Sequence, residues 1–109
     1  MSVYVVSMIR VDDPETYSEY TSRTPPTVKA HGGKFLARGG TVDTVEGEPF
    51  NKRLAILEFP SKEAVSQWLA SPEYQEAKQY RDASSEAHIL VIEGTPDGYA
   101  PNPQVVKSG

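Results

Sequence analysis

The stretch KRLAILEF, residues 52–59, predicts a strand that is apolar on both of its faces. Successive side chains of a strand point to opposite faces, so Ala55 and Leu57 share one face while Leu54 and Ile56 share the other. A sheet with one covered face normally alternates apolar and polar residues. We therefore expect something to cover this strand on both sides.

Further stretches of the chain predict strands of the same kind. SVYVVSMIRV (2–11) and EAHILVIEG (86–94) are rich in β-branched and aromatic residues and carry apolar side chains on both faces. KFLAR (34–38) predicts a short strand, and the glycines at 39–40 indicate a break or bulge. TVDTVEG (41–47) alternates, so we expect it to continue that strand.

A helical region follows the first strand. An aspartate cap before Pro14 predicts where it begins. Pro25 and Pro26 are expected to break or kink this helix, because a proline lacks the N–H that the helix needs and restricts the residue before it. PPTVKAH then restarts it for a turn or two, and Gly32 and Gly33 supply the left-handed stop that commonly ends helices.

The second helical region consists of two offset pieces. Ser61 caps KEAVSQWLAS (62–71), and the pair Ser71 and Pro72 starts PEYQEAKQYRD (72–82). The element order is therefore β-α-β-β-α-β, in the α+β class. This order predicts a four-stranded antiparallel sheet with the helices on one face.

Length and composition exclude several classes of protein. The chain has 109 residues, which fits one domain, and a net charge of −4 with scattered basic residues, so neither a nucleic acid nor an anionic membrane is an expected partner. It has no cysteine, which excludes disulfides and thiolate catalysis. No signal-peptide pattern and no apolar run of about 20 residues are present, so we expect a cytoplasmic protein.

The second apolar face of the sheet predicts a partner. Exposing it would leave several hundred Å² of apolar surface, which monomers rarely tolerate. We expect a second copy to pack sheet to sheet against it, as a homodimer. The alternative is that the proline-rich tail 95–109 folds back over this face; otherwise that tail is disordered or an arm laid on a neighbour.

Four runs, AHGGKFLARGG, RLAILEFPS, SPEYQEAKQYR and ILVIEG, resemble in this order the DUF1330 family of the dimeric α/β-barrel superfamily. The resemblance covers about residues 2–94, which gives a domain over 1–94 and leaves the tail 95–109 outside it. It implies a ferredoxin-like βαββαβ protomer whose sheet pairs with a second copy into a barrel-like homodimer. It implies no function, because the family is uncharacterised and its relatives include cofactor-free monooxygenases, lactone isomerases, haem enzymes and ligand-binding regulators.

His31 and Arg38 are the candidate catalytic residues. His31 falls at the end of the first helical region, where it caps the negative helix end or serves as a general base at the mouth of a pocket. Arg38 shares strand parity with Lys34 and Leu36. It is either an exposed charge at the edge of the sheet or a guanidinium that binds an anionic ligand through its paired N–H groups. Together they would suit proton transfer on a small carbonyl or phenolic compound, or oxygenation in which the substrate itself activates oxygen.

Other side chains are candidates for contact with a ligand. Glu58 interrupts an apolar strand, so it either pairs with Arg10 or Arg53 or lines a cavity. Tyr74 and Arg81 share a helical face. Aromatic residues could line a pocket between helices and sheet, whereas the pattern favours an ordinary core position for the tryptophan. The set is Tyr4, Tyr17, Glu58, Trp68, Tyr74 and Arg81.

The sequence predicts no metal and no cofactor. His88 shares strand parity with Leu90 and Ile92, which predicts a sheet or interface histidine, and neither histidine has the spacing of a metal site. Three functions stay open: a cofactor-independent enzyme acting on a small anionic or aromatic compound, a non-catalytic small-molecule binding or stress-response module, and a structural dimer with a filled core. A void beside His31 and Arg38 would favour the first two.

Overall fold

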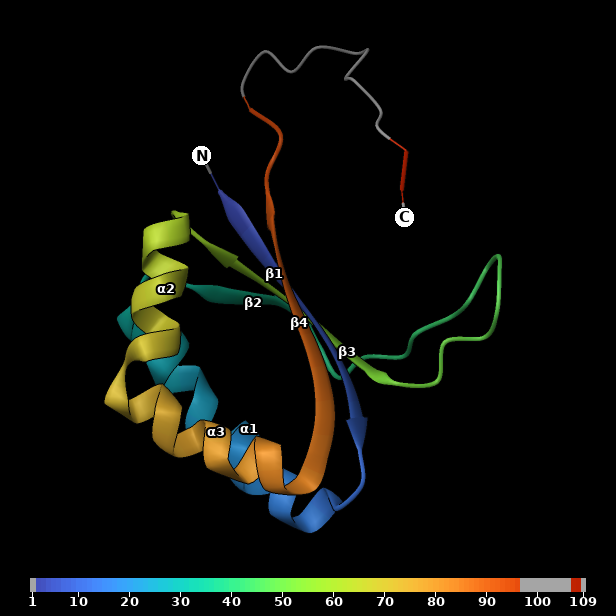
Figure 1. Cartoon of the computed structure of the whole chain (residues 1–109), viewed down its shortest axis with the longest axis horizontal. Helices are drawn as coiled ribbons and strands as arrows, with labels where there is room; N and C mark the ends of the chain where they lie inside the picture. Colours follow the sequence, from blue (N-terminus) through green and yellow to red (C-terminus); the bar gives the residue numbers. More distant parts are fainter. Residues whose placement is uncertain (1, 97–106, 109) are drawn as a thin grey trace.

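The computed structural model describes residues 2–96 and 107–108. It has one antiparallel sheet, whose strands are β1 (Val3–Val11), β2 (Lys34–Arg38), β3 (Arg53–Phe59) and β4 (Ser85–Glu93). The strand order is β2-β3-β1-β4. The helices are α1 (Pro14–Ala30), α2 (Lys62–Ala70) and α3 (Pro72–Ser84), and they cover one face of the curved sheet (Figure 1). The predicted α+β, ferredoxin-like order is confirmed.

The core lies between the helices and the face of the sheet that they cover, which we call the inner face. Val5 is fully buried there, and Leu57 and Phe59 are nearly so. Trp68 of α2 and Tyr74 of α3 close this core from the helix side. The predicted offset of α2 and α3 is also confirmed, because the hydroxyl of a single serine at 71 accepts from the backbone N–H of Tyr74 and starts α3 where α2 ends.

Of the break or kink expected at the prolines of α1, the break is wrong, since α1 runs without interruption from Pro14 to Ala30. Pro25 has no N–H to donate to the carbonyl of Thr21, four residues earlier. The guanidinium of Arg38 donates to that carbonyl instead, over 2.6 Å. A donor from the neighbouring strand thus replaces the missing helix hydrogen bond.

The glycine stop after α1 is confirmed. The N–H of Gly33 donates to the carbonyl of Val28 (3.0 Å) and that of Gly32 to the carbonyl of Lys29 (3.1 Å), which is the Schellman pattern. Gly32 has a φ of +76°, in the left-handed region that favours glycine. This turn leads the chain directly into β2.

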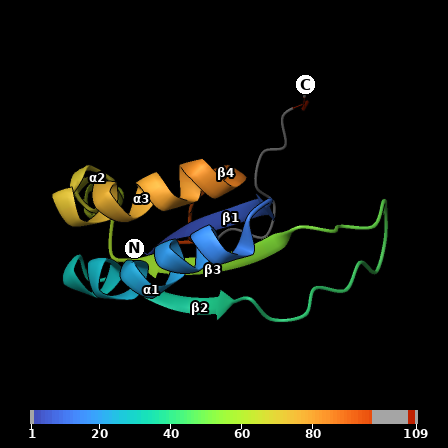
Figure 2. The same cartoon turned by 90° about the horizontal axis from the view of Figure 1, so that it is seen from below.

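The expected continuation of β2 over 41–47 is also wrong. β2 ends at Arg38, and residues 39–52 form a loop that projects from the body of the protein (Figure 2). Gly39 adopts a φ of +70°, which turns the chain away from β3. Without a neighbouring strand to pair with, an alternating sequence does not form a strand; Val45 at the loop is 92% exposed.

The second face of the sheet, which we call the outer face, is largely apolar, and no helix among the described residues covers it. The strand register places side chains from the three long strands on it: Tyr4, Val6, Met8, Leu54, Ile56, Glu58, His88, Leu90 and Ile92. The tail 95–109, expected to be disordered, to form an arm or to fold back over this face, lies outside the described residues apart from Thr95, Pro96 and residues 107–108. Within the described ranges, no helix has the length and apolar character to cross a membrane.

Candidate functional site

A small cavity, which we call the inner cavity, lies between α1 and the inner face of the sheet. Its volume is about 20 Å³, which is room for about one water molecule. Polar side chains line it from one helix and two neighbouring strands: Tyr17, Tyr20 and Thr21 from α1, Arg38 from β2 and Arg53 from β3. A surface hollow of about 400 Å³ shares Tyr17, Thr21 and Arg53 with it.

Arg38 reaches the inner cavity because β2 carries a bulge. The register against β3 shifts between Phe35 and Ala37, so Arg38 pairs with Ala55 of the inner face. Its predicted parity with Lys34 is therefore wrong beyond the bulge. The guanidinium lies 4.5 Å from the centre of the Phe35 ring, and burial, followed by the nearby charge of Arg53, lowers the pKa of Arg38.

Arg53 is the second cation at the inner cavity. Its guanidinium carbon lies 5.6 Å from the centre of the Tyr17 ring. Burial raises the pKa of Tyr17, so this phenol stays neutral. Among the residues that the structure describes, neither Arg38 nor Arg53 forms a salt bridge with a carboxylate. Two guanidinium groups that lack a carboxylate form a site suited to an anion.

Trp68 forms the far wall of the inner cavity. Its ring centre lies 5.0 Å from that of Phe59 and 4.4 Å from that of Tyr74, and its indole N–H donates to Oγ1 of Thr27 over 3.0 Å. The residue is 2% exposed. Trp68 thus contributes both to the core and to the lining of the cavity.

Behind this wall, Tyr74 and Arg81 are buried and interact with each other. Nη1 of Arg81 donates to the Tyr74 hydroxyl over 2.6 Å, and this hydroxyl lies 3.1 Å from that of Tyr20. Tyr20 also lines the inner cavity, so the chain of contacts connects α3 to the cavity through α1. Neither Tyr74 nor Arg81 lines the cavity itself.

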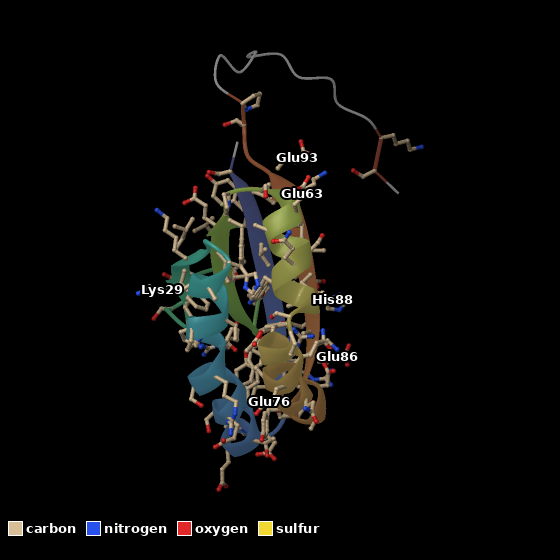
Figure 3. All side chains as sticks on the ribbon, turned by 90° about the vertical axis from the view of Figure 1, so that its left-hand side faces the viewer. Lys29, Glu63, Glu76, Glu86, His88 and Glu93 are labelled. Carbon is tan, nitrogen blue, oxygen red and sulfur yellow. The ribbon has the colours of Figure 1, made fainter. Side chains whose placement is uncertain are left out.

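His31 lies elsewhere, at a groove between α1 and α3 that we call the helix groove. This groove has a volume of about 350 Å³, and Arg23, Glu73 and Glu76 also line it; Figure 3 shows Glu76 on α3 and Lys29 on α1. Nδ1 of His31 lies 2.9 Å from the carbonyl of Thr27. Because a carbonyl only accepts, Nδ1 carries the hydrogen, and Nε2 is the basic atom of the neutral ring.

The structure therefore does not bring His31 and Arg38 together. His31 lines the helix groove, whereas Arg38 lines the inner cavity, and no described residue lines both. His31 keeps the capping position that its place in the sequence favours. Its role as a base acting with Arg38 stays a prediction without a shared cavity to support it.

Two of the predicted ligand contacts lie on the outer face instead. Tyr4 and Glu58 are paired neighbours on β1 and β3. Glu58 forms a salt bridge with Lys34 (3.4 Å), so the predicted partners Arg10 and Arg53 are wrong. A hydrogen bond with Ser2, followed by one with Lys34, lowers the pKa of Glu58.

His88 also lies on the outer face, as its parity predicts. It pairs with Met8 of β1 and is exposed. Figure 3 shows it on β4, on the opposite side of the molecule from Lys29 of α1. No group of three or more histidine, aspartate or glutamate side chains within the described residues is arranged to hold a metal ion.

Sequence reasoning missed Arg53 as a site residue, although a signal was present. Arg53 has the same strand parity as Ala55, Leu57 and Phe59, all of which belong to the inner face. An arginine that alternates in register with the buried side chains of its strand is a candidate for an inward-facing cation. Tyr20, three residues after Tyr17 on one face of the helix, was among the aromatic residues predicted to line a pocket between helices and sheet.

Comparison with solved structures shows the same fold in several bacterial proteins. A protein of unknown function from Rhodopseudomonas palustris has a TM-score of 0.74 at 20% identity, over 87% of this chain and 83% of that one. A dimeric ferredoxin-like protein of unknown function from Jannaschia sp. CCS1 has a TM-score of 0.72 at 14% identity, over 86% and 100%. SnoaB from Streptomyces nogalater, a cofactor-independent oxygenase, has a TM-score of 0.64 at 18% identity, over 87% and 94%.

At these identities the likeness concerns the fold and leaves the activity open. No curated protein sequence matches the chain. The model of a family described as a domain of unknown function, DUF1330, matches residues 2–95, and this span includes every strand and helix of the structure. The chain therefore belongs to the DUF1330 family.

Proposed function

We propose that this protein binds a small anionic aromatic compound at the inner cavity and the hollow beside it. The observation that carries the proposal is the pair of guanidinium groups, Arg38 and Arg53, with no carboxylate salt bridge within the described part of the chain. Both side chains are half-buried, and a cation that is removed from part of its water without an opposite charge is destabilised. An anionic ligand would supply the missing charge, and the ring of Tyr17 would contact its aromatic part.

The size of the cavity restricts how such a ligand enters. The inner cavity, at about 20 Å³, accepts one oxygen atom or a water molecule, whereas the adjoining hollow of about 400 Å³ accommodates a ring. We therefore place the ring in the hollow, against Pro14 and Tyr17, and the charged oxygen at the inner cavity between Arg38 and Arg53.

The chemistry that this site supports is stabilisation of a substrate oxyanion. Two guanidinium groups in a half-buried site favour the ionised form of a bound phenol or enol. An electron-rich anion of this kind suits a cofactor-independent reaction, either proton transfer or oxygenation in which the substrate activates oxygen. SnoaB, with the same fold, is described as a cofactor-independent oxygenase. This likeness makes oxygenation the reaction to test first.

A second candidate function is non-catalytic binding of the same class of compound. It is favoured by the lining of the inner cavity, where none of the described residues is a histidine, aspartate or glutamate that could act as a general base. The candidates differ in turnover and agree on the ligand. Oxygen consumption with a dihydroxynaphthalene under air, compared with the rate without protein, separates them.

The binding proposal is tested with 4-nitrophenol, whose colour reports its ionisation. We expect the wild-type protein to lower the pKa of the bound phenol, and Arg53→Gln to lose about tenfold in affinity for the phenolate. Arg10→Gln is the matched control, because Arg10 is exposed and already pairs with Asp12 and Glu86. Equal affinity in the wild type and Arg53→Gln would overturn the proposal.

The predicted role of His31 as a catalytic base has its own test. If a reaction is observed, His31→Gln keeps the size of the side chain and removes the basic Nε2. A loss of turnover with unchanged binding of 4-nitrophenol would support the role. Unchanged turnover would assign His31 to capping α1 alone.

The outer face supports a further proposal, that two copies of this chain pair through it. Leu90 and Ile92 are 52% and 60% exposed there, next to the apolar side chains of β1 and β3. A dimeric protein with this fold is known from Jannaschia sp. CCS1. A second copy carries the same apolar outer face, so pairing would cover the outer faces of both copies.

A further inference from the structure

Three buried side chains behind the inner cavity form a continuous hydrogen-bonded chain. Nη1 of Arg81 donates to Oη of Tyr74 over 2.6 Å, and Oη of Tyr74 lies 3.1 Å from Oη of Tyr20. Their exposed fractions are 7%, 0% and 8% in the same order. Tyr20 is the member of the chain that lines the inner cavity, beside Arg38 and Arg53.

The chemistry of these groups sets the direction of the chain. A guanidinium group only donates, so the oxygen of Tyr74 accepts from Arg81. Burial raises the pKa of Tyr74 above its usual range, and its hydroxyl therefore keeps its hydrogen. Across the described residues, Tyr20 is the sole acceptor within reach of that hydrogen. Because a buried hydroxyl hydrogen is rarely left unpaired, Tyr74 donates to Tyr20.

One hydrogen is then left over at Tyr20. Its oxygen is occupied as the acceptor from Tyr74, and no acceptor for its own hydrogen is found in the described part of the chain. Nε of Arg81 is buried without a partner as well. This cluster thus contains more N–H and O–H hydrogens than oxygen atoms to accept them.

We infer that the Tyr20 hydroxyl is a preset hydrogen-bond donor to the ligand, held in that orientation by Tyr74 and Arg81. The inference rests on the proposed function, and it adds a specificity to it. With Tyr20, Arg38 and Arg53 all donating, the inner cavity selects an oxygen that accepts hydrogen bonds, such as a phenolate or an enolate. A hydroxyl hydrogen or an amine at the same place meets no acceptor among these three side chains.

Two probes of nearly equal shape test this selection. 4-Nitrophenolate presents an accepting oxygen, and 4-nitroaniline presents a donating amine. We expect Tyr20→Phe to weaken binding of 4-nitrophenolate about tenfold in calorimetry and to change binding of 4-nitroaniline less than twofold. Tyr80→Phe is the matched control, because Tyr80 lies on α3 and does not line the inner cavity.

The outcomes separate this inference from the binding proposal. If Arg53→Gln weakens 4-nitrophenolate and Tyr20→Phe does not, the binding proposal stands and the assignment of Tyr20 is overturned. If the wild type prefers 4-nitroaniline or does not distinguish the probes, the binding proposal itself fails.

A neutron structure of the deuterated, ligand-free protein tests the orientation without any ligand. The deuterium of Tyr74 is expected between the two phenol oxygens, and that of Tyr20 directed to the inner cavity. The reverse placement, with the deuterium of Tyr20 directed to Tyr74, overturns the inference even if Tyr20→Phe does not fold.

Discussion

The two faces of the sheet are made from alternate residues of the same strands, yet their surroundings differ completely. On the inner face, Val5 and Leu57 are 0% and 3% exposed beneath the helices. On the outer face, Leu90 and Ile92 keep more than half of their surface exposed although they are equally apolar. The helices therefore account for one half of the apolar pattern, and no element among the described residues accounts for the other half.

The largest effect is expected from removing a large side chain from the core between the helices and the inner face. Trp68→Ala removes a buried side chain that contacts Phe59 and Tyr74 and donates to Thr27. We expect a loss of about 3–5 kcal/mol in the free energy of unfolding, measured by urea denaturation. Gln67→Ala, an exposed neighbour on the same helix, is the control, with a change within about 0.5 kcal/mol. A loss of that small size in Trp68→Ala would contradict the assignment of Trp68 to the core.

A charge introduced on the outer face is expected to weaken the association of two copies and to leave the fold of each copy unchanged. Leu90→Glu places a carboxylate on a side chain that is half exposed in one chain, so the isolated protomer should keep its helices and sheet. If two copies pair here, the charge would be buried between them, and we expect the dimer to dissociate at micromolar concentration. Sedimentation measures the mass, and circular dichroism measures the fold.

Ala83→Glu on α3 is the control for that experiment, because it adds the same charge at an exposed helix position that does not belong to the outer face. A wild-type protein that sediments as a monomer would contradict pairing through the outer face. So would a Leu90→Glu variant that remains a dimer.

Local signals in the sequence predicted most of the fold. The glycines at 32–33 end α1 as expected, Ser71 divides the second helical region, and the apolar parity of residues 54–57 matches the two faces of β3. Each of these signals concerns residues that lie within a few positions of one another in the sequence. For that reason the chain alone was sufficient to find them.

The mistaken predictions all depend on contacts between distant residues. Pro25 does not end α1, because Arg38 supplies a donor from another element. The direction of Arg38 depends on a bulge that only its pairing with β3 reveals. Residues 41–47 alternate like a strand but have no neighbouring strand to pair with. The candidate site was predicted in part for the same reason, since its cations come from two strands and its phenols from a helix.

A medium effect is expected where the inner face supports α1. Arg38→Met removes the donor to the Thr21 carbonyl, and we expect a loss of about 1–2 kcal/mol in the free energy of unfolding. Pro25→Ala restores the helix N–H that points to this carbonyl. It should therefore recover about 1 kcal/mol in the Arg38→Met background and less in the wild type. Pro26→Ala is the control, because the N–H that it restores would donate to the carbonyl of Ser22. Equal recovery by both variants would contradict the replacement of the missing helix hydrogen bond by Arg38.

The smallest effect is expected from the charged pair on the outer face, between Glu58 and Lys34. Hydrogen bonds with Ser2 and Lys34 hold the pKa of Glu58 below its usual range in the folded protein. A carboxyl group with a lowered folded pKa contributes its stability above the unfolded pKa and loses it as the pH falls through the folded pKa. The wild type should therefore lose stability below about pH 4.3, and Glu58→Gln should lose less over the same interval. Urea midpoints of both proteins, measured at several pH values under the same salt, give this difference. Because the pair is at the surface, raising the salt concentration should shrink it. A steeper acid loss in Glu58→Gln than in the wild type would contradict the lowered pKa of Glu58 and show that its charged form is not stabilised on this face.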